Sequence, residues 1–370
     1  MKNFKIKTLF LSLVISTAVS AQIQFEDNVP FQQVLNRSKS ENKLIFMDCY
    51  TTWCGPCKWL VSNVFSDKKL GEVYNSQFVN YKLDMEKGEG LDLAKKFGIQ
   101  AYPTLLWLNE NGEVVYRIVG TNSIESFLEY ASSLKDDENH FPSMVKKFEA
   151  GNREPEFLKK LAIAATNGYE ANASTYVEAY LNAISKEDWS KPENNTLIYS
   201  ASKTFDSNTT EYVLENSKKF EPTLVEAIKS QCLDYELKAA IESRSEEKLK
   251  ALLTLVDRYS PDKQEFKQSA ELYFYQTIGD RKKLNELATK YLKSSNDPNL
   301  LNEYAWERFE NETDLTLLKE AITWAERSVK LEKHFYNTDT LGQLYKKVGN
   351  TKKADKWLKE SKILETKENQ

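Results

Sequence analysis

The chain has 370 residues, of which 41% are hydrophobic and 29% charged, with only 12 glycines and 9 prolines. This composition is typical of a folded, helix-rich protein with two or three domains, and it excludes a largely disordered chain. The net charge is −4 and no Lys/Arg-rich block follows the N-terminus, which argues against nucleic-acid binding.

The first 21 residues are predicted to be a cleaved export signal. Three lysines among the first seven residues precede the apolar stretch 9–19, which is too short to span a bilayer comfortably. Small side chains at positions 19–21 favour cleavage before Gln22, and loss of the three lysines changes the net charge from −4 to −7. The segment has no cysteine for a lipid anchor. We therefore expect an exported protein, periplasmic if its host is a Gram-negative bacterium.

The next predicted elements surround a pair of cysteines. Residues 43–50 form an apolar, strand-like run that carries one acid, Asp48, and lead into Trp53-Cys54-Gly55-Pro56-Cys57. Residues 58–65 then have the pattern of a helix. Two cysteines two residues apart at a helix N-terminus are typical of a redox dithiol. The pattern predicts thiol–disulfide exchange.

Two other uses of this cysteine pair are weaker. A structural disulfide would close a very short loop, and stabilisation by loop closure grows with loop length. A zinc site would need further ligands, and the chain has only two histidines, His140 and His334, both far away in sequence. No Gly-rich phosphate loop is present either. We expect no metal and no cofactor other than the redox-active disulfide Cys54–Cys57.

The elements that follow alternate between strand and helix. Ser66 to Lys69 has the pattern of a helix start, and Asn109 to Gly112 that of a hairpin turn. The predicted strands are 78–84, 105–108 and 113–119, and the predicted helices are 91–97, ended by Gly98, and 123–134.

This order, β-α-β-α-β-β-α, resembles the thioredoxin family from about residue 30 to residue 135. The dithiol, the acid Asp48 and the proline of Ala101-Tyr102-Pro103-Thr104 all fall in family order. The segment 64–67, followed by a helix that carries a tyrosine, is also similar to the periplasmic C-terminal module of DsbD-type proteins.

The resemblance implies a role for each matched residue of the dithiol site. Cys54, the more exposed thiol, would attack the substrate disulfide, and Cys57 would resolve the mixed disulfide. Asp48 would lie buried beneath the site with a raised pKa and take the proton from Cys57. Lys82 matches the family lysine beside this acid, although a solvated lysine fits its position almost as well.

The resemblance also implies a substrate groove. Pro103 would be cis and face the dithiol, and the backbone of Tyr102 would pair with the substrate. Many thioredoxins carry a β-branched aliphatic residue where this chain has Tyr102. Trp53 and Gly120 would line the same groove, with a purely structural role equally open for both.

The residues between the cysteines, Gly55 and Pro56, bear on whether the dithiol reduces or oxidises its substrates. This dipeptide, as in reducing thioredoxins, provides no imidazolium to stabilise the Cys54 thiolate, which favours a reductant. The resemblance then implies recharging by a membrane thiol-electron donor of the DsbD kind. Cys49 and Cys232, the remaining cysteines, are expected to be buried thiols.

Beyond a polar run at 135–139 the strand patterns end, and residues 143–295 have the pattern of successive helices. The clearest helical segments are Glu156 to Ala165, Ala173 to Ile184, Leu224 to Ser243, Glu246 to Tyr259 and Asp262 to Thr277.

The last 75 residues contain a repeat. Ala321, Trp324 and Leu331 recur 33 residues later as Ala354, Trp357 and Leu364. Together with Leu341-Gly342-x-x-Tyr345, this spacing resembles tetratricopeptide repeats. We therefore expect an α/β thioredoxin fold followed by an all-α, tetratricopeptide-like region. The predicted divisions are a signal peptide at 1–21, a thioredoxin-like domain at 22–136, a helical array at 137–295 and repeats at 296–370.

Two functions fit this organisation. The first is an exported thiol–disulfide oxidoreductase that reduces protein disulfides through Cys54 and Cys57, with the helical region docking protein partners. The second is a non-catalytic binding or scaffold protein whose repeats carry the function and whose thioredoxin domain is a redox-sensitive module. The set of Cys54, Cys57, Asp48 and Pro103 favours the first, because a scaffold does not need all four.

Overall fold

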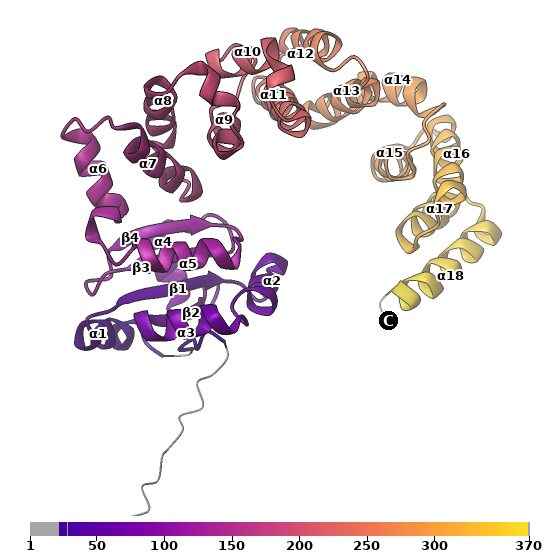
Figure 1. Ribbon diagram of the computed structural model, residues 1–370. Coiled ribbons are helices and arrows are strands. Elements are labelled where there is room, and N and C mark those ends of the chain that lie inside the picture. The colour runs from indigo at the N-terminus through magenta and orange to yellow at the C-terminus, as the bar shows by residue number, and fades with distance from the viewer. Residues whose placement is uncertain (1–21, 28, 369–370) are drawn as a thin grey trace, which may run out of the picture. The chain divides into compact units, whose positions relative to one another are not determined.

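A computed structural model describes residues 22–27 and 29–368, which form two compact units (Figure 1). The first unit contains the described residues up to 202 together with 207–225, and the second contains 203–206 and the residues from 226 onward. The predicted export signal lies outside the described residues. Within 22–27 and 29–368, no helix combines the length and the hydrophobicity that a membrane span requires.

The first part of the first unit is built on a four-stranded mixed sheet, in the order β2-β1-β3-β4. Strand β1 pairs parallel with β2 and antiparallel with β3, which pairs antiparallel with β4. This confirms the predicted α/β fold and the order of its elements. The elements are α1 (Phe31–Glu41), β1 (Leu44–Tyr50), α2 (Gly55–Asn63), α3 (Lys68–Gln77), β2 (Phe78–Asp84), α4 (Gly90–Phe97), β3 (Thr104–Leu108), β4 (Val114–Val119) and α5 (Ile124–Ser133).

Strand β1 is central and is covered on both faces. Side chains alternate along a strand, so Ile45, Met47 and Cys49 point to one face and join a cluster with residues of α1 and α4. Phe46 and Asp48 point to the other face. There Phe46 packs against the rings of Phe65, Tyr74, Trp107 and Phe127, with centroids 4.8–6.2 Å apart. This burial explains why the strand is a nearly continuous apolar run.

Capping residues and a turn mark the ends of several elements where the sequence predicts them. Asp67 caps α3 by accepting a hydrogen bond from the backbone N–H of Leu70, at 2.8 Å. Gly98 ends α4 in the left-handed conformation, with φ +60°. The side chain of Asn109 accepts bonds from the backbone N–H groups of Asn111 and Glu113, which closes the turn before β4.

Helices complete the first unit, and two of them cover the edge of the sheet. Helices α6 and α7 pack against β4, where the Arg117 guanidinium donates to the carbonyl of Phe97 (2.7 Å) and lies 3.9 Å from the Glu170 carboxylate. The helices of this part are η1 (Asp137–Asn139), α6 (Phe141–Glu149), α7 (Pro155–Asn167), α8 (Ala173–Ala183), η2 (Lys186–Ser190), η3 (Pro192–Asn194), α9 (Asn195–Ala201), α10 (Asn208–Glu215) and η4 (Ser217–Lys219).

The second unit is all-α in its described residues, as the sequence predicts. Helix α15 packs on α16, α16 on α17, and α17 on α18. The helices are α11 (Pro222–Glu242), which begins in the first unit, α12 (Glu246–Tyr259), α13 (Gln264–Ile278), α14 (Arg281–Leu292), α15 (Pro298–Asn311), α16 (Leu315–Leu331), α17 (Phe335–Lys347) and α18 (Thr351–Glu368).

The last two helices approach each other closely at Gly342. A Cβ atom at this position would lie 2.7 Å from the Leu358 side chain and 3.1 Å from its backbone nitrogen. Such distances are shorter than carbon–carbon van der Waals contact, so a larger residue would force α17 and α18 apart.

We predict that Gly342→Val destabilises the α17–α18 pair by about 1–3 kcal/mol, because overpacking outweighs the small gain in helix propensity. Hydrogen exchange of the α17 and α18 amides measures this locally. Lys346→Val adds the same branched side chain at an exposed position of α17 and serves as the matched control. Equal protection of wild type and Gly342→Val would contradict the predicted close packing.

Candidate active site

The two cysteines of the motif form a disulfide at the start of α2. The Cα atoms of Cys54 and Cys57 are 5.3 Å apart. Cys54 is the N-cap residue, and its sulfur accepts the backbone N–H of Cys57 at 3.1 Å. Pro56 lies in the first turn, where no intrahelical N–H bond is lost. In the reduced state, the same N–H groups and the helix dipole would stabilise a thiolate at Cys54.

The cysteines are equally buried while the disulfide is closed. Their exposed fractions are 2% for Cys54 and 3% for Cys57, so the expected greater exposure of Cys54 is not seen in this state. The asymmetry between them lies in the backbone instead. Cys54 precedes the first turn of α2, and Cys57 lies inside that turn.

Asp48 lies buried beside Cys57, as the sequence predicts. Its exposed fraction is 2%, and its Oδ1 atom has no hydrogen-bond partner among the described residues. Burial raises the pKa of this carboxyl from 3.8 to about 7, and the positive charge of Lys82 only partly opposes that rise. Asp48 and Cys57 line one pocket of about 280 Å³, together with Tyr50, Thr51, Thr52, Lys58, Val61, Ser62 and Lys82.

Lys82 is the parallel partner of Asp48 across β1 and β2. Its ammonium group forms an ion pair with Asp27 at 3.2 Å, and its side chain is about one third exposed. The lysine therefore lies near the acid, as predicted, while its direct ion pair is to a carboxylate that the sequence did not single out.

The peptide bond between Tyr102 and Pro103 is cis, which confirms the predicted isomer. The Pro103 carbonyl accepts the backbone N–H of Gly120 at 2.9 Å, so two predicted groove residues are in direct contact. Gly120 has φ +94°, a conformation that L residues with a side chain rarely adopt.

Trp53 and Tyr102 meet at the surface. Their rings are in a T-shaped contact with centroids 6.0 Å apart, and Trp53 is 65% exposed. The indole N–H of Trp53 donates to the Glu86 carboxylate at 2.9 Å. Glu86 is missed by sequence reasoning, because it lies 33 residues from Trp53 in a loop without a recognisable motif.

The two remaining cysteines are not part of the Cys54–Cys57 disulfide. Cys49 is a buried free thiol on the opposite face of β1, and burial raises its pKa well above the usual value. Cys232 is buried in α11. Among residues 22–27 and 29–368, no cluster of three or more His, Cys, Asp or Glu residues could hold a metal ion.

Comparisons with known proteins find matches to the thioredoxin-like part of the chain. Residues 31–135 match the family model of a thioredoxin-like domain. Thioredoxin H4 of Arabidopsis thaliana is 35% identical over 88 residues, which are 24% of this chain and 69% of that protein. Thioredoxin-1 of Saccharomyces cerevisiae is 42% identical over 83 residues, 22% of this chain and 74% of that one.

A solved structure is more similar in sequence. The solution structure of a protein from Bacteroides thetaiotaomicron, proposed to be a disulphide-isomerase, has 49% identity and a TM-score of 0.29. The match covers 30% of this chain and 93% of that one.

We predict that Asp48→Asn stabilises the oxidised protein above pH 7. The folded state holds the proton of Asp48 up to about pH 7, and the unfolded state releases it near 3.8. The ionised carboxyl therefore costs the folded state on the order of 4 kcal/mol at pH 8. That cost shrinks as the pH falls below 7 and vanishes below about 4.

Denaturant unfolding of wild type and Asp48→Asn across pH 4–9 measures this difference. Asp27→Asn is the matched control, because its carboxylate is more than one third exposed and pairs with Lys82 at the surface. A stability difference that does not change with pH would show that Asp48 is not the titrating group.

Proposed function

The chain belongs to the thioredoxin family through a thioredoxin-like domain, residues 31–135, that carries the redox-active Cys54–Cys57 pair; from this premise, we propose that it is an exported protein-disulfide reductase. The observation that carries the proposal is the buried Asp48 carboxyl beside Cys57, under a disulfide at a helix N-terminus. A disulfide with only a structural role does not require an acid in this place.

The proposed reaction transfers two electrons from the dithiol to a substrate disulfide. The Cys54 thiolate attacks one substrate sulfur, which forms a mixed disulfide and releases the other substrate sulfur as a thiolate. Cys57 then loses its proton and attacks the Cys54 sulfur. This closes the Cys54–Cys57 disulfide and releases the second substrate sulfur as a thiolate.

Asp48 would accept the proton from Cys57 in the second step. A pKa of about 7 suits this role, because near neutral pH the carboxyl is present both as an acceptor and as a proton carrier. The pocket of about 280 Å³ that Asp48 and Cys57 share provides room for a bridging water.

The proposal includes the direction of electron transfer, from the dithiol to the substrate, and the export of the protein. Gly55 and Pro56 provide no charge that would stabilise a reduced Cys54 thiolate, so we expect a potential near the roughly −270 mV of thioredoxin rather than the roughly −120 mV of DsbA. An exported reductant needs an electron supply, and we propose a membrane thiol-electron donor of the DsbD kind.

The helical region is proposed to dock protein partners through tetratricopeptide-like repeats. The close contact of Gly342 with Leu358 in the pair α17–α18 supports this proposal. Ala321 and Ala354, one from each repeat, are both fully or almost fully buried, as small residues at a helix–helix contact should be.

We predict that the chain reduces insulin disulfides when dithiothreitol is supplied, and that Cys54→Ser lowers the rate at least a hundredfold, because it removes the attacking thiolate. Cys49→Ala should keep the activity, because this thiol lies on the opposite face of β1. Cys57→Ala should accumulate mixed disulfides with substrates. If the wild type shows no turnover, the reductase proposal is wrong and the binding or scaffold function is favoured instead.

Another prediction concerns the transfer of the Cys57 proton to Asp48. Asp48→Asn should slow the resolution of a preformed mixed disulfide by about 10–100-fold at pH 7, since general base catalysis typically contributes this much or more. The wild-type resolution rate should rise with pH around 7. Single-turnover release of a thiol-labelled peptide measures both effects, and an unchanged rate would remove Asp48 from the mechanism.

A further inference from the structure

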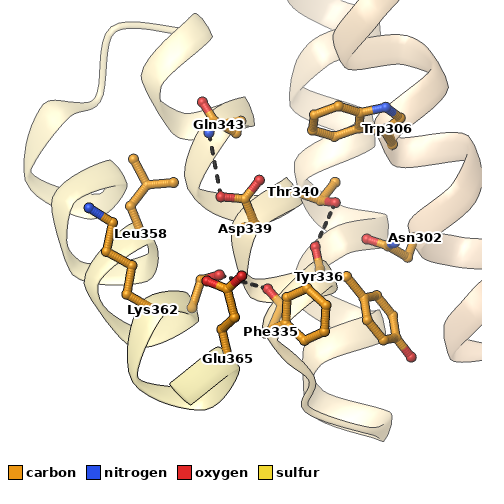
Figure 2. A pocket seen from close by; sticks show the side chains of 11 residues that line it. Asn302, Trp306, Phe335, Tyr336, Asp339, Thr340, Gln343, Leu358, Lys362 and Glu365 are labelled. Atoms are coloured by element: carbon orange, nitrogen blue, oxygen red, sulfur yellow. Dashed lines mark hydrogen bonds between the residues drawn. The ribbon is translucent and has the colours of Figure 1, made fainter. Parts of the chain in front are cut away.

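A groove of about 670 Å³ crosses the last helices of the second unit (Figure 2). This volume is in the range of about 300–1,000 Å³ that is typical of ligand sites. Figure 2 shows side chains of α17 in the middle, with Asn302 and Trp306 of α15 on one side and Leu358, Lys362 and Glu365 of α18 on the other.

The groove is made by one stripe of each helix. Phe335, Asp339 and Gln343 follow one another at four-residue steps along α17, and Asn302 and Trp306 do the same on α15. The buried apolar residues Leu341, Leu344 and Tyr345 of α17 belong to other positions of the helix and form the core. The core therefore does not require the polar residues of the stripe.

Several polar groups in the groove are left for a ligand. The Asp339 and Glu365 carboxylates form no ion pair with any described residue, and the lining contains only one cation, Lys362. Asp339 accepts only a long bond of 3.4 Å from the Gln343 amide. The buried Oδ1 atom of Asn302, beside the groove, has no hydrogen-bond donor among the described residues.

From these features we infer that the groove binds an extended peptide segment of a protein partner, with a lysine or arginine of that segment placed at Asp339 and Glu365. Two carboxylates against one ammonium favour a cation and disfavour phosphate or other anionic ligands. The side-chain amide of Gln343 provides a donor and an acceptor, which match the peptide unit.

The aromatic residues complete this fit. A lysine or arginine carries an apolar stem below its charge, and Trp306 and Phe335, both half-buried, offer surface for such a stem. The inference deepens the partner-docking part of the proposed function, and it does not depend on the disulfide chemistry, since no lining residue belongs to the thioredoxin-like domain.

The test uses the chain from residue 22 to residue 370 and a phage-displayed library of random twelve-residue peptides, depleted beforehand on the charge-reversed variant Asp339→Lys. Enriched peptides are synthesised with a fluorophore and titrated by anisotropy. We expect them to carry Lys or Arg. Asp339→Asn and Glu365→Gln should each weaken binding by about two- to fivefold, since a partly exposed ion pair contributes this much.

The matched control is Asp355→Asn, an exposed carboxylate of α18 outside the groove, which should bind like wild type. A complementary measurement leaves the protein unchanged: norleucine in place of the peptide's basic residue should weaken binding to the same extent. Both losses should shrink at high salt, because they are electrostatic.

Three results of the peptide measurements would overturn the inference. These are no enrichment, enriched peptides without a basic residue, and equal losses in Asp355→Asn and Asp339→Asn. Concentration-dependent dimerisation that Asp339→Lys abolishes would also overturn it, because the occupant would then be a second copy of the chain. Peptide binding should persist in Cys54→Ser, which lacks the attacking thiol, so this inference and the proposed reductase activity fail separately.

Discussion

The burial of one carboxyl group is the constraint on which the dithiol site depends. Asp48 lies on the central strand, almost without solvent contact, and one of its oxygen atoms has no hydrogen-bond partner among the described residues. An ionised carboxylate in such a place costs several kcal/mol, so the surrounding core must offset this cost. The ring cluster around Phe46, two residues away on the same face of β1, contributes much of the apolar burial that does so.

The same constraint explains how the site is divided between elements. Alternation along β1 places Asp48 on the face of Phe46 and leaves Cys49 in the opposite cluster, where burial keeps its thiol protonated. The N-terminus of α2 would stabilise the Cys54 thiolate, since its free N–H groups favour negative charge there. Asp48 is thus suited to hold a proton, and Cys54 is suited to lose one.

Much of this arrangement was predictable from the sequence, because it is encoded locally. Strand β2 and helix α12 have the predicted bounds, since period-two and period-3.6 patterns end there at clear caps and turns. The burial of Asp48 followed from an acid within an apolar run. Helix α1 was not assigned from the sequence, because its mostly polar residues bury only Phe31, Val34 and Ser38.

What could not be predicted depends on contacts between distant residues. The ion pair of Lys82 with Asp27 and the bond from Trp53 to Glu86 join segments that no short motif connects. The equal burial of the two cysteines follows from the closed disulfide and its surroundings rather than from their order in the chain. The groove of Figure 2 needs three helices at once, and the stripe that each contributes looks like an ordinary helix face in the sequence.

The dithiol and the groove belong to different compact units, and this separation has a physical consequence. A dithiol that must act on many disulfides cannot bind each one tightly, because tight product binding would slow release. In the proposal, a second site on the same chain would hold the substrate protein and so raise the effective concentration of its disulfide at Cys54. This gain needs only a linker that can span both sites, with no new contact at the dithiol. The proposal would then let affinity depend on Asp339 and Glu365, and reactivity on Asp48.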